Sequence, residues 1–264
     1  EQEENGTSRI YPIGEQETRV NHPEQSGYFS GACGITHYGG GAFPADFNNN
    51  LLVADCVLNL VHFDVLSSEG SAFKTSRSRE KVEFLASSDR SFRPVNMTVG
   101  PDGSLYVLDI HREVIEHPEW IPDEMEEKMD LNAGKDQGRI YRIIPKGNWS
   151  PISSDFNMDD IQGLVAALGS KNQWTRTTAQ RLLVTNNKTE TTTLLEAQFE
   201  NSEDDLARLH SLWTLEGLGD LKTSVLKKAL HDSSTGIREN AIKIAERKIN
   251  KEIALVDELI VLVN

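Results

Sequence analysis

The chain has 264 residues and a formal net charge of -14, because its 41 Asp and Glu residues outnumber its 27 Lys and Arg residues. Nucleic-acid binding requires a concentrated basic surface, so this composition argues against a nucleic-acid partner. No run of apolar residues approaches the roughly 18 that a membrane-spanning helix needs, and we expect no membrane span in this chain.

The first half of the sequence has the pattern of short strands separated by turns. Alternating apolar residues predict strands over 32–38 and 81–86. The segment 50–66 predicts two further strands, joined by a turn about 55–58. The first half is therefore predicted to be a β domain.

Two cysteines lie on these neighbouring predicted strands. Cys33 and Cys56 are compatible with a disulfide and equally with two buried free thiols. The sequence has no C-x-x-C-H motif, so it contains no site for covalent attachment of a c-type haem.

The segment 93–110 predicts two alternating strands joined by a tight turn at 100–103, and a third strand is predicted over 138–144. A hairpin of this kind is typical of half a β-propeller blade. The predicted strands make about two blades, whereas closed propellers typically have about four to eight. Two blades cannot close a ring, so either residues 1–150 are the C-terminal blades of a larger β-propeller, which is the fold class that we predict, or their open edge packs on a further partner.

The segment 109–137 between these strands is too long and too charged for a simple hairpin loop. Long loops of a propeller gather on one face around the central channel, where ligands bind. The candidate cofactor- or substrate-binding residues of this loop are Asp109, His111, Arg112, Glu113, Glu116 and His117.

Three interpretations of this loop are open. An arginine and a histidine can hold a carboxylate or sugar hydroxyls, and a histidine beside a carboxylate can act as a general base. His111, His117 and Glu113 also offer metal-ligand chemistry, although their spacing matches no standard metal site. In the structural alternative, Arg112 and Glu116 form salt bridges that anchor the loop, and His117 with the following proline ends a helical turn. We assign no metal site and no catalytic residue from this pattern.

After residue 150 the pattern changes to the helical period. Apolar residues at spacings of three and four, separated by short breaks, predict helices that are antiparallel neighbours. These predicted helices cover 159–168, 173–185, 191–199, 204–217, 223–230, 236–249 and 253–263. We predict that residues 151–264 form a HEAT-like α-solenoid, which makes the fold class multi-domain, β then α.

An arginine recurs near the start of every second predicted helix, at Arg176, Arg208 and Arg238, and a small residue follows three positions after each. An arginine at this position can bond the preceding inter-helix turn, and the small residue lets helices approach closely. We expect a structural role for these arginines, at equivalent places in successive repeats.

Several separated motifs of the chain occur in the same order in a known protein family. These motifs are SGACG (30–34), YGGGAFP (38–44), NLVH (59–62), FRPVNMTVGPDGSLYVLD (92–109), REVIEHPEWIP (112–122) and GRIYRI (138–143). Over about residues 8–250 the chain resembles the large secreted membrane-bound dehydrogenase-like proteins of Planctomycetes, Verrucomicrobia and Bacteroidetes. It departs from the family pattern at His111, where the family has an aromatic residue, and at Ala54, where the family has a cysteine.

The resemblance implies a propeller similar to those of the quinoprotein glucose/sorbosone dehydrogenases, followed by HEAT-like repeats and often by a c-type haem domain. It also implies a periplasmic or secreted location. Pyrroloquinoline quinone with calcium is the cofactor that it implies for the full-length protein.

Two functional hypotheses follow. In the first, the chain is an internal fragment of a quinoprotein-like sugar or alcohol dehydrogenase, is inactive in isolation, and acts as a ligand- or partner-binding module. In the second, it is a non-catalytic propeller and solenoid scaffold that binds glycans or proteins. The expected partners are a sugar or glycan, a protein, or a haem domain of the same polypeptide.

Overall fold

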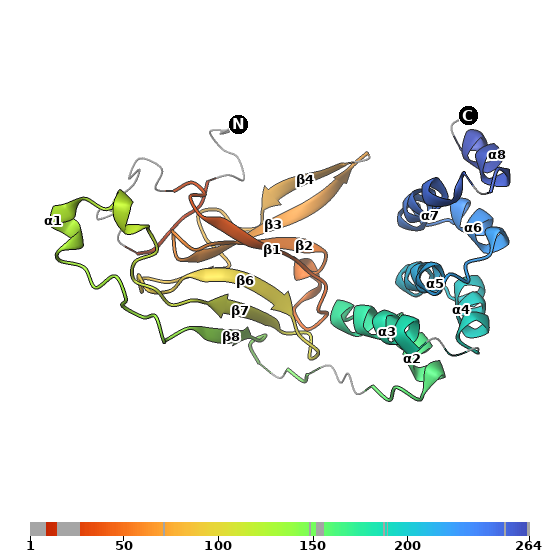
Figure 1. Cartoon of the computed structure of the whole chain (residues 1–264), viewed down its shortest axis with the longest axis horizontal. Helices are drawn as coiled ribbons and strands as arrows, with labels where there is room; N and C mark the ends of the chain where they lie inside the picture. The colour runs from red at the N-terminus through yellow and green to blue at the C-terminus, as the bar shows by residue number, and fades with distance from the viewer. Residues whose placement is uncertain are drawn as a thin grey trace. The chain divides into compact units, whose positions relative to one another are not determined.

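A computed structural model of the chain describes residues 9–14, 27–70, 72–147, 149–151, 156–186, 188, 190–250 and 252–262. The chain has two compact units, residues 1–152 and 153–264. The first unit is built mainly from β-sheets and the second from α-helices (Figure 1). The predicted order of β then α is confirmed.

Five strands of the first unit make one antiparallel sheet. They are β1 (Ala32–Tyr38), β2 (Asn50–Asp55), β3 (Leu60–Glu69), β4 (Ala72–Arg77) and β5 (Leu85–Ala86). Strands β1 to β4 are neighbours in chain order, and β5 pairs with β3. The strand predicted over 32–38 and the two strands predicted within 50–66 are confirmed.

Two differences from the prediction concern the edges of this sheet. The strand predicted over 81–86 is wrong for most of its length, because only Leu85 and Ala86 pair with β3. Strand β4 has no counterpart among the predicted strands. Its side chains are exposed or half-buried throughout, so it lacks the alternation that marks a strand with one buried face.

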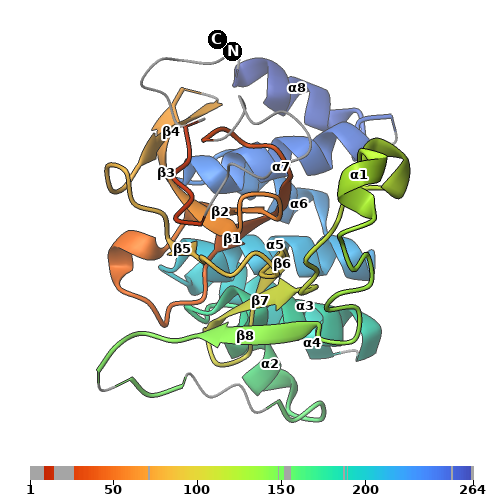
Figure 2. The same cartoon turned by 90° about the vertical axis from the view of Figure 1, so that its left-hand side faces the viewer.

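A second antiparallel sheet contains β6 (Pro94–Val99), β7 (Leu105–Asp109) and β8 (Arg139–Ile143), in that order. Figure 2 shows these three strands side by side. Met97 lies opposite Val107, and Val107 lies opposite Tyr141. The hairpin predicted over 93–110 and the strand predicted over 138–144 are therefore confirmed. The two sheets contact each other through β1 and β6.

A tyrosine hydroxyl fixes the glycine-rich turn after β1. The fully buried Tyr38 donates to the carbonyl oxygen of Gly103 at 2.8 Å. Its hydroxyl oxygen accepts the backbone N–H groups of Ala42 and Phe43 at 3.2 and 3.0 Å. A Cβ at Gly40 would lie 2.2 Å from the carbonyl oxygen of Gly103, so only glycine fits there. Burial raises the pKa of Tyr38, which keeps the donating hydroxyl protonated.

The segment between β7 and β8 extends away from the three-stranded sheet (Figures 1 and 2). It carries the short 3-10 helix η3 (Pro118–Trp120) and the four-residue helix α1 (Asp123–Glu126). The long, charged loop predicted there is present, and it includes these two short helical turns.

The second unit consists of α-helices in its described residues. They are α2 (Ile161–Ala167), α3 (Gln173–Asn186), α4 (Glu190–Asn201), α5 (Asp205–Leu218), α6 (Thr223–Leu230), α7 (Thr235–Lys248) and α8 (Ala254–Val261). Each corresponds to a predicted helix, with ends that differ by a few residues. Helix α5 contacts both α3 and α7, and these three form one row, beside the row of α2, α4, α6 and α8 (Figure 1).

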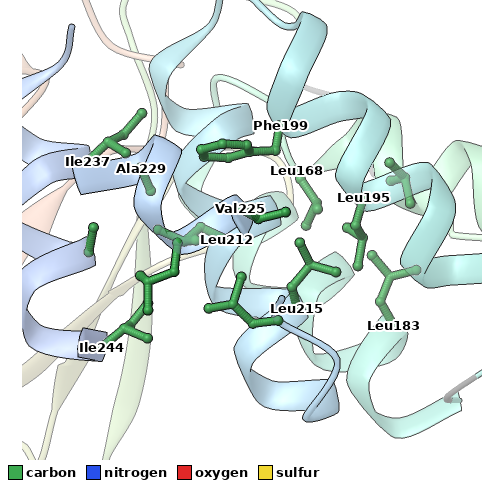
Figure 3. Packing of buried hydrophobic residues seen from close by; sticks show 14 of the residues in the cluster. Leu168, Leu183, Leu195, Phe199, Leu212, Leu215, Val225, Ala229, Ile237 and Ile244 are labelled. Carbon is green, nitrogen blue, oxygen red and sulfur yellow. The ribbon is translucent and has the colours of Figure 1, made fainter. Parts of the chain in front are cut away.

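Leucine side chains fill the space between the two rows (Figure 3). Leu183 of α3, Leu195 of α4, and Leu212 and Leu215 of α5 are fully buried. Burying one such side chain stabilises a fold by about 1.5–3 kcal/mol. The helical unit therefore has a hydrophobic core of its own. Within the part of the chain that the structure describes, no helix has the length and apolar character needed to cross a membrane.

The three repeat arginines make the same contact. In each case Nη1 donates to the carbonyl oxygen of a residue in the turn before the arginine's own helix. The pairs are Arg176 with Ser170, Arg208 with Ser202 and Arg238 with Asp232, at 2.6, 2.8 and 2.8 Å. The expectation that these arginines are structural and equivalent is confirmed.

Candidate ligand-binding site

A buried carboxylate sets the direction in which the chain leaves β7. Asp109 is 3% exposed, and its Oδ1 accepts the backbone N–H groups of Arg93 and His111, both at 2.7 Å. Its Oδ2 lies 3.4 Å from Nδ1 of His111 and 4.0 Å from Nε of Arg139. His111 has a φ of 49°, in the left-handed region that favours glycine. The carboxylate thus holds the chain in a sharp bend at the start of the loop.

One arginine ties this loop to the first sheet. Arg93 is 5% exposed, and its Nε and Nη2 donate to the carbonyl oxygens of Arg112 and Glu113 at 2.8 and 2.7 Å. Its Nη1 donates to the carbonyl oxygens of Cys56 and Val57, in the turn between β2 and β3. Because all of its donating nitrogens serve backbone carbonyls, Arg93 positions the loop rather than offering a free group to a ligand.

The far end of the loop packs back on its start through a glycine. Gly134 has a φ of 80°, and a Cβ there would lie 2.0 Å from the carbonyl oxygen of His111. The backbone N–H of Glu113 donates to Ala133 at 3.4 Å. Only glycine permits this approach, which brings the chain around residue 131 next to Arg112.

Arg112 lines a pocket formed by these two parts of the loop. Its Nη2 donates to the carbonyl oxygen of Leu131 at 2.7 Å. Its Nε is buried and has no hydrogen-bond partner among the described residues. The pocket has a volume of about 340 Å³ and is lined by Ile110, Arg112, Val114, Ile115, Glu116, Pro118 and Leu131. It is therefore an apolar pocket with one cationic and one anionic side chain.

The predicted site residues separate into three groups. Arg112 and Glu116 line the pocket. Asp109 and His111 lie at the base of the loop, where they are buried against each other. Glu113 and His117 are exposed and do not line the pocket. Proximity in the sequence therefore does not bring all six predicted residues together.

Two parts of the structural alternative for this loop are wrong. Neither Arg112 nor Glu116 forms a salt bridge within the described part of the chain, and Arg112 instead anchors the loop through the carbonyl oxygen of Leu131. His117 begins the short helix η3 rather than ending a helical turn, because its Nδ1 accepts the backbone N–H of Glu119 at 3.3 Å. The general idea that Arg112 anchors the loop is correct, with a backbone carbonyl as the partner.

The first sheet carries a buried ionic cluster that the sequence pattern does not predict. His62 is 1% exposed, its Nδ1 lies 2.6 Å from Oε2 of Glu83, and its Nε2 lies 3.2 Å from Oδ1 of Asp64. Arg77 donates to Oε1 of Glu83 at 2.7 Å. Burial opposes the charged imidazolium, but the hydrogen bonds to Asp64 and Glu83 outweigh it and raise the pKa of His62. The cluster joins β3, β4 and the segment between β4 and β5 through side chains that are largely buried.

One signal for this cluster was present in the sequence. His62 and Asp64 are two residues apart on a strand, so their side chains lie on the same face. The third member, Glu83, lies on the segment after β4, where the sequence pattern wrongly predicts a strand. Its position beside His62 follows from the tertiary fold alone.

The pocket does not fit pyrroloquinoline quinone with calcium. The described residues, among them His111, Glu113 and His117, include no group of three or more His, Cys, Asp or Glu side chains that could hold a metal ion. Calcium requires several oxygen ligands. The quinone carries several carboxylates, which the carboxylate of Glu116 would repel. We therefore derive no reaction step through this cofactor.

These features define a two-unit protein in which a β unit with a long, pocket-forming loop precedes a helical unit. The family described as Domain of unknown function (DUF7133) matches residues 1–147, more than half of the chain. The chain belongs to this family. No curated protein and no solved structure matches it.

Proposed function

We propose that this chain is a ligand-binding module whose pocket at Arg112 takes a neutral polyhydroxylic ligand such as a sugar. In this proposal residues 1–150 are propeller blades similar to those of quinoprotein sugar dehydrogenases, and residues 151–264 are a HEAT-like solenoid. The protein acts in the periplasm or outside the cell. The resemblance of the motifs supports these assignments, and the β-then-α order is the order that they require.

The observation that carries the proposal is that Arg112 and Glu116 line one otherwise apolar pocket. A hydrogen bond from a ligand oxygen to a charged group such as the Arg112 guanidinium contributes about 1.5–3 kcal/mol. The pocket volume of about 340 Å³ suits a small ligand.

The other lining residues favour a neutral ligand with hydroxyl groups. A hydroxyl can accept from the Arg112 guanidinium and can also donate to the Glu116 carboxylate. An anionic ligand would be attracted by the Arg112 guanidinium but repelled by the Glu116 carboxylate. Ile115 and Pro118 provide apolar walls for the carbon face of a sugar ring.

The test is a calorimetric titration of the chain with a panel of monosaccharides and polyols. At least one neutral compound should bind saturably, and Arg112→Ala should weaken its binding by about 1.5–3 kcal/mol, the range for hydrogen bonds to charged groups. Arg79→Ala is the matched control, because Arg79 is an exposed arginine of the same unit outside the pocket. It should leave binding unchanged.

Two results would contradict this proposal. If no compound of the panel binds saturably, the pocket does not take a neutral polyhydroxylic ligand. An Arg112→Ala variant that binds normally but melts well below the wild type would show that Arg112 acts only as the anchor of residue 131.

For the parent activity we propose the oxidation of a sugar or related alcohol, with electrons passed to a haem domain, as in the dehydrogenases that the motifs resemble. The support is the resemblance alone. The test is a titration of the longer polypeptide with the quinone, with and without calcium, followed by a dye-linked sugar oxidation assay. Unchanged dye reduction under all conditions would contradict a dehydrogenase.

A protein-binding scaffold is the alternative function. It is favoured by apolar side chains that α8 and the residue before it leave exposed, with Ile253 78%, Ile260 55% and Val261 63% exposed. Exposed apolar patches are typical of interaction surfaces. This alternative predicts no saturable sugar binding, so the monosaccharide titration distinguishes it from the ligand-binding module.

A further inference from the structure

One tryptophan of the β unit differs from the other tryptophans in its exposure. The side chain of Trp120 is 67% exposed. The other three tryptophans are half-buried, and each ring packs against a second side chain: Trp149 against Arg142, Trp174 against Phe156 and Trp213 against Arg247. Within the described part of the chain, the Trp120 ring has no such contact. A large aromatic ring left in water offers a surface on which another molecule can pack.

The turn that carries Trp120 also forms part of the pocket wall. Trp120 is the last residue of η3, and the first residue of η3, Pro118, lines the pocket. The two residues are separated by about 4 Å along the axis of this turn, because a 3-10 helix rises about 2 Å per residue. Trp120 is not itself a lining residue. It therefore lies beside the pocket rather than inside it.

Local contacts hold this turn in one conformation. The backbone N–H of Trp120 donates to the carbonyl oxygen of His117 at 2.9 Å, and that of Ile121 donates to Pro118 at 2.9 Å. The side chain of Ile121 is 4% exposed, so it anchors the end of the turn in the β unit. Pro118 and Pro122 restrict the backbone on both sides of Trp120. A ring on a fixed backbone loses little conformational freedom when a ligand packs on it, which favours binding.

The charges around Trp120 select against an anionic ligand. Glu119 precedes it, and Asp123 and Glu124 follow it in the first turn of α1. All three side chains are exposed. They would repel a sugar acid or a sulfated sugar. A neutral sugar ring meets no such repulsion, and it can pack its C–H face on the indole while its hydroxyl groups stay hydrated at the edge.

We propose that Trp120 forms a second sugar-binding position beside the pocket, so that the ligand class of this site is a neutral oligosaccharide of at least two sugar units. One unit occupies the pocket at Arg112 and Glu116, and the next unit packs on the indole of Trp120. This inference rests on the proposed function, because it requires a sugar in the pocket. It adds the length and the charge of the ligand, and it assigns Trp120 as a specificity-determining residue.

The test compares monosaccharides with disaccharides by calorimetric titration of the whole chain. The probes are glucose with maltose and cellobiose, xylose with xylobiose, and mannose with mannobiose. At least one disaccharide should bind about tenfold more tightly than its own monosaccharide. Trp120→Ala should remove this difference and leave monosaccharide binding unchanged, and Trp120→Phe should keep part of the difference. Phe73→Ala is the matched control, because Phe73 is a 69% exposed aromatic residue of β4 outside the pocket, and it should keep the full difference.

Acrylamide quenching of tryptophan fluorescence provides a second readout. Trp120 should be the tryptophan most accessible to the quencher, because the other three are half-buried. The saturating disaccharide should reduce quenching of the wild type, whereas its monosaccharide should not, since only the disaccharide covers the indole. In Trp120→Phe the disaccharide should have no effect on quenching. An identical effect of the disaccharide in wild type and Trp120→Phe would overturn the inference.

The titrations separate failure of this inference from failure of the proposed function. If monosaccharides bind and no disaccharide binds more tightly, the inference is wrong and the proposed function stands. If Trp120→Ala weakens monosaccharide and disaccharide binding equally, Trp120 shapes the pocket itself, and the second sugar position is wrong. If no sugar of either length binds saturably, both the inference and the proposed function are wrong.

Discussion

Two histidines illustrate how the surroundings of a single residue set its charge. His62 lies between the carboxylates of Asp64 and Glu83, and its hydrogen bonds to them raise its pKa although burial opposes the charged form. His210 of the helical unit accepts from Nε of Arg176 at 3.2 Å and lies 2.7 Å from Oε1 of Gln180. Burial, with a smaller effect of the Arg176 charge, lowers the pKa of His210 to about 4, so its ring is neutral in the folded protein.

These opposite shifts predict opposite pH dependences of stability in the two units. The unfolded chain protonates His210 below about pH 6.5 and the folded chain only below about pH 4, so the helical unit should lose up to about 3 kcal/mol as the pH falls through this window. The contribution of His62 is fully present below pH 6.5 and is lost as the pH rises through its raised folded pKa.

Urea unfolding is measured at a series of pH values, with the backbone amide NMR signals of each unit as the probe of its unfolding. This measures how the free energy of unfolding of each unit depends on pH. His210→Gln should abolish the acid slope of the helical unit, and His62→Gln should abolish the alkaline slope of the β unit. Each variant is the control for the other. Wild-type slopes in both variants would contradict these assignments.

The residues of the candidate site were predictable only in part. The sequence places Arg112 and Glu116 in one loop, and the structure brings both to the pocket. The anchor of Arg112 on Leu131 depends on the close approach at Gly134, which no local pattern specifies.

At the scale of elements, the spacing of apolar residues correctly predicted the helices and strands that bury one face. The hairpin β6–β7 and helices α2 to α8 each bury one face, and their patterns identify them correctly. Strand β4 buries no face, and α1 has only four residues, so neither produces a periodic signal. The propeller and solenoid assignments go beyond these elements and stay proposals.

The repeat arginines predict a graded effect on the helical unit. Arg208 also donates to both carboxylate oxygens of Asp232 at 3.0 Å, and these side chains are 11% and 10% exposed. Arg208→Met would leave the half-buried Asp232 carboxylate without its cationic partner, although Oδ1 still accepts the backbone N–H of Ser234, so it should reduce the free energy of unfolding by about 1.5–3 kcal/mol. Arg238→Met removes hydrogen bonds to two carbonyls and to Thr235, and should cost about 1 kcal/mol.

Urea unfolding of both methionine variants provides the comparison, because the two substitutions have the same chemistry and equivalent positions. Equal losses of stability would show that the Asp232 ion pair adds nothing to the shared turn contact.

At the scale of the whole molecule, each unit has its own core, and the pocket is formed entirely by residues 110–131 of the β unit. The family match also lies in that unit. The ligand-binding account therefore depends on the β unit alone, and the helical unit enters it only through the proposed scaffold role.

The most direct test of the account is the ¹H–¹⁵N signal of the Arg112 side-chain Nε–H group, assigned with an Arg112→Lys variant. Addition of the neutral sugar that binds should shift this signal saturably, while the signal of exposed Arg79 stays in place. If the Arg112 signal does not move at saturating sugar, the ligand does not occupy this pocket and the central claim is wrong.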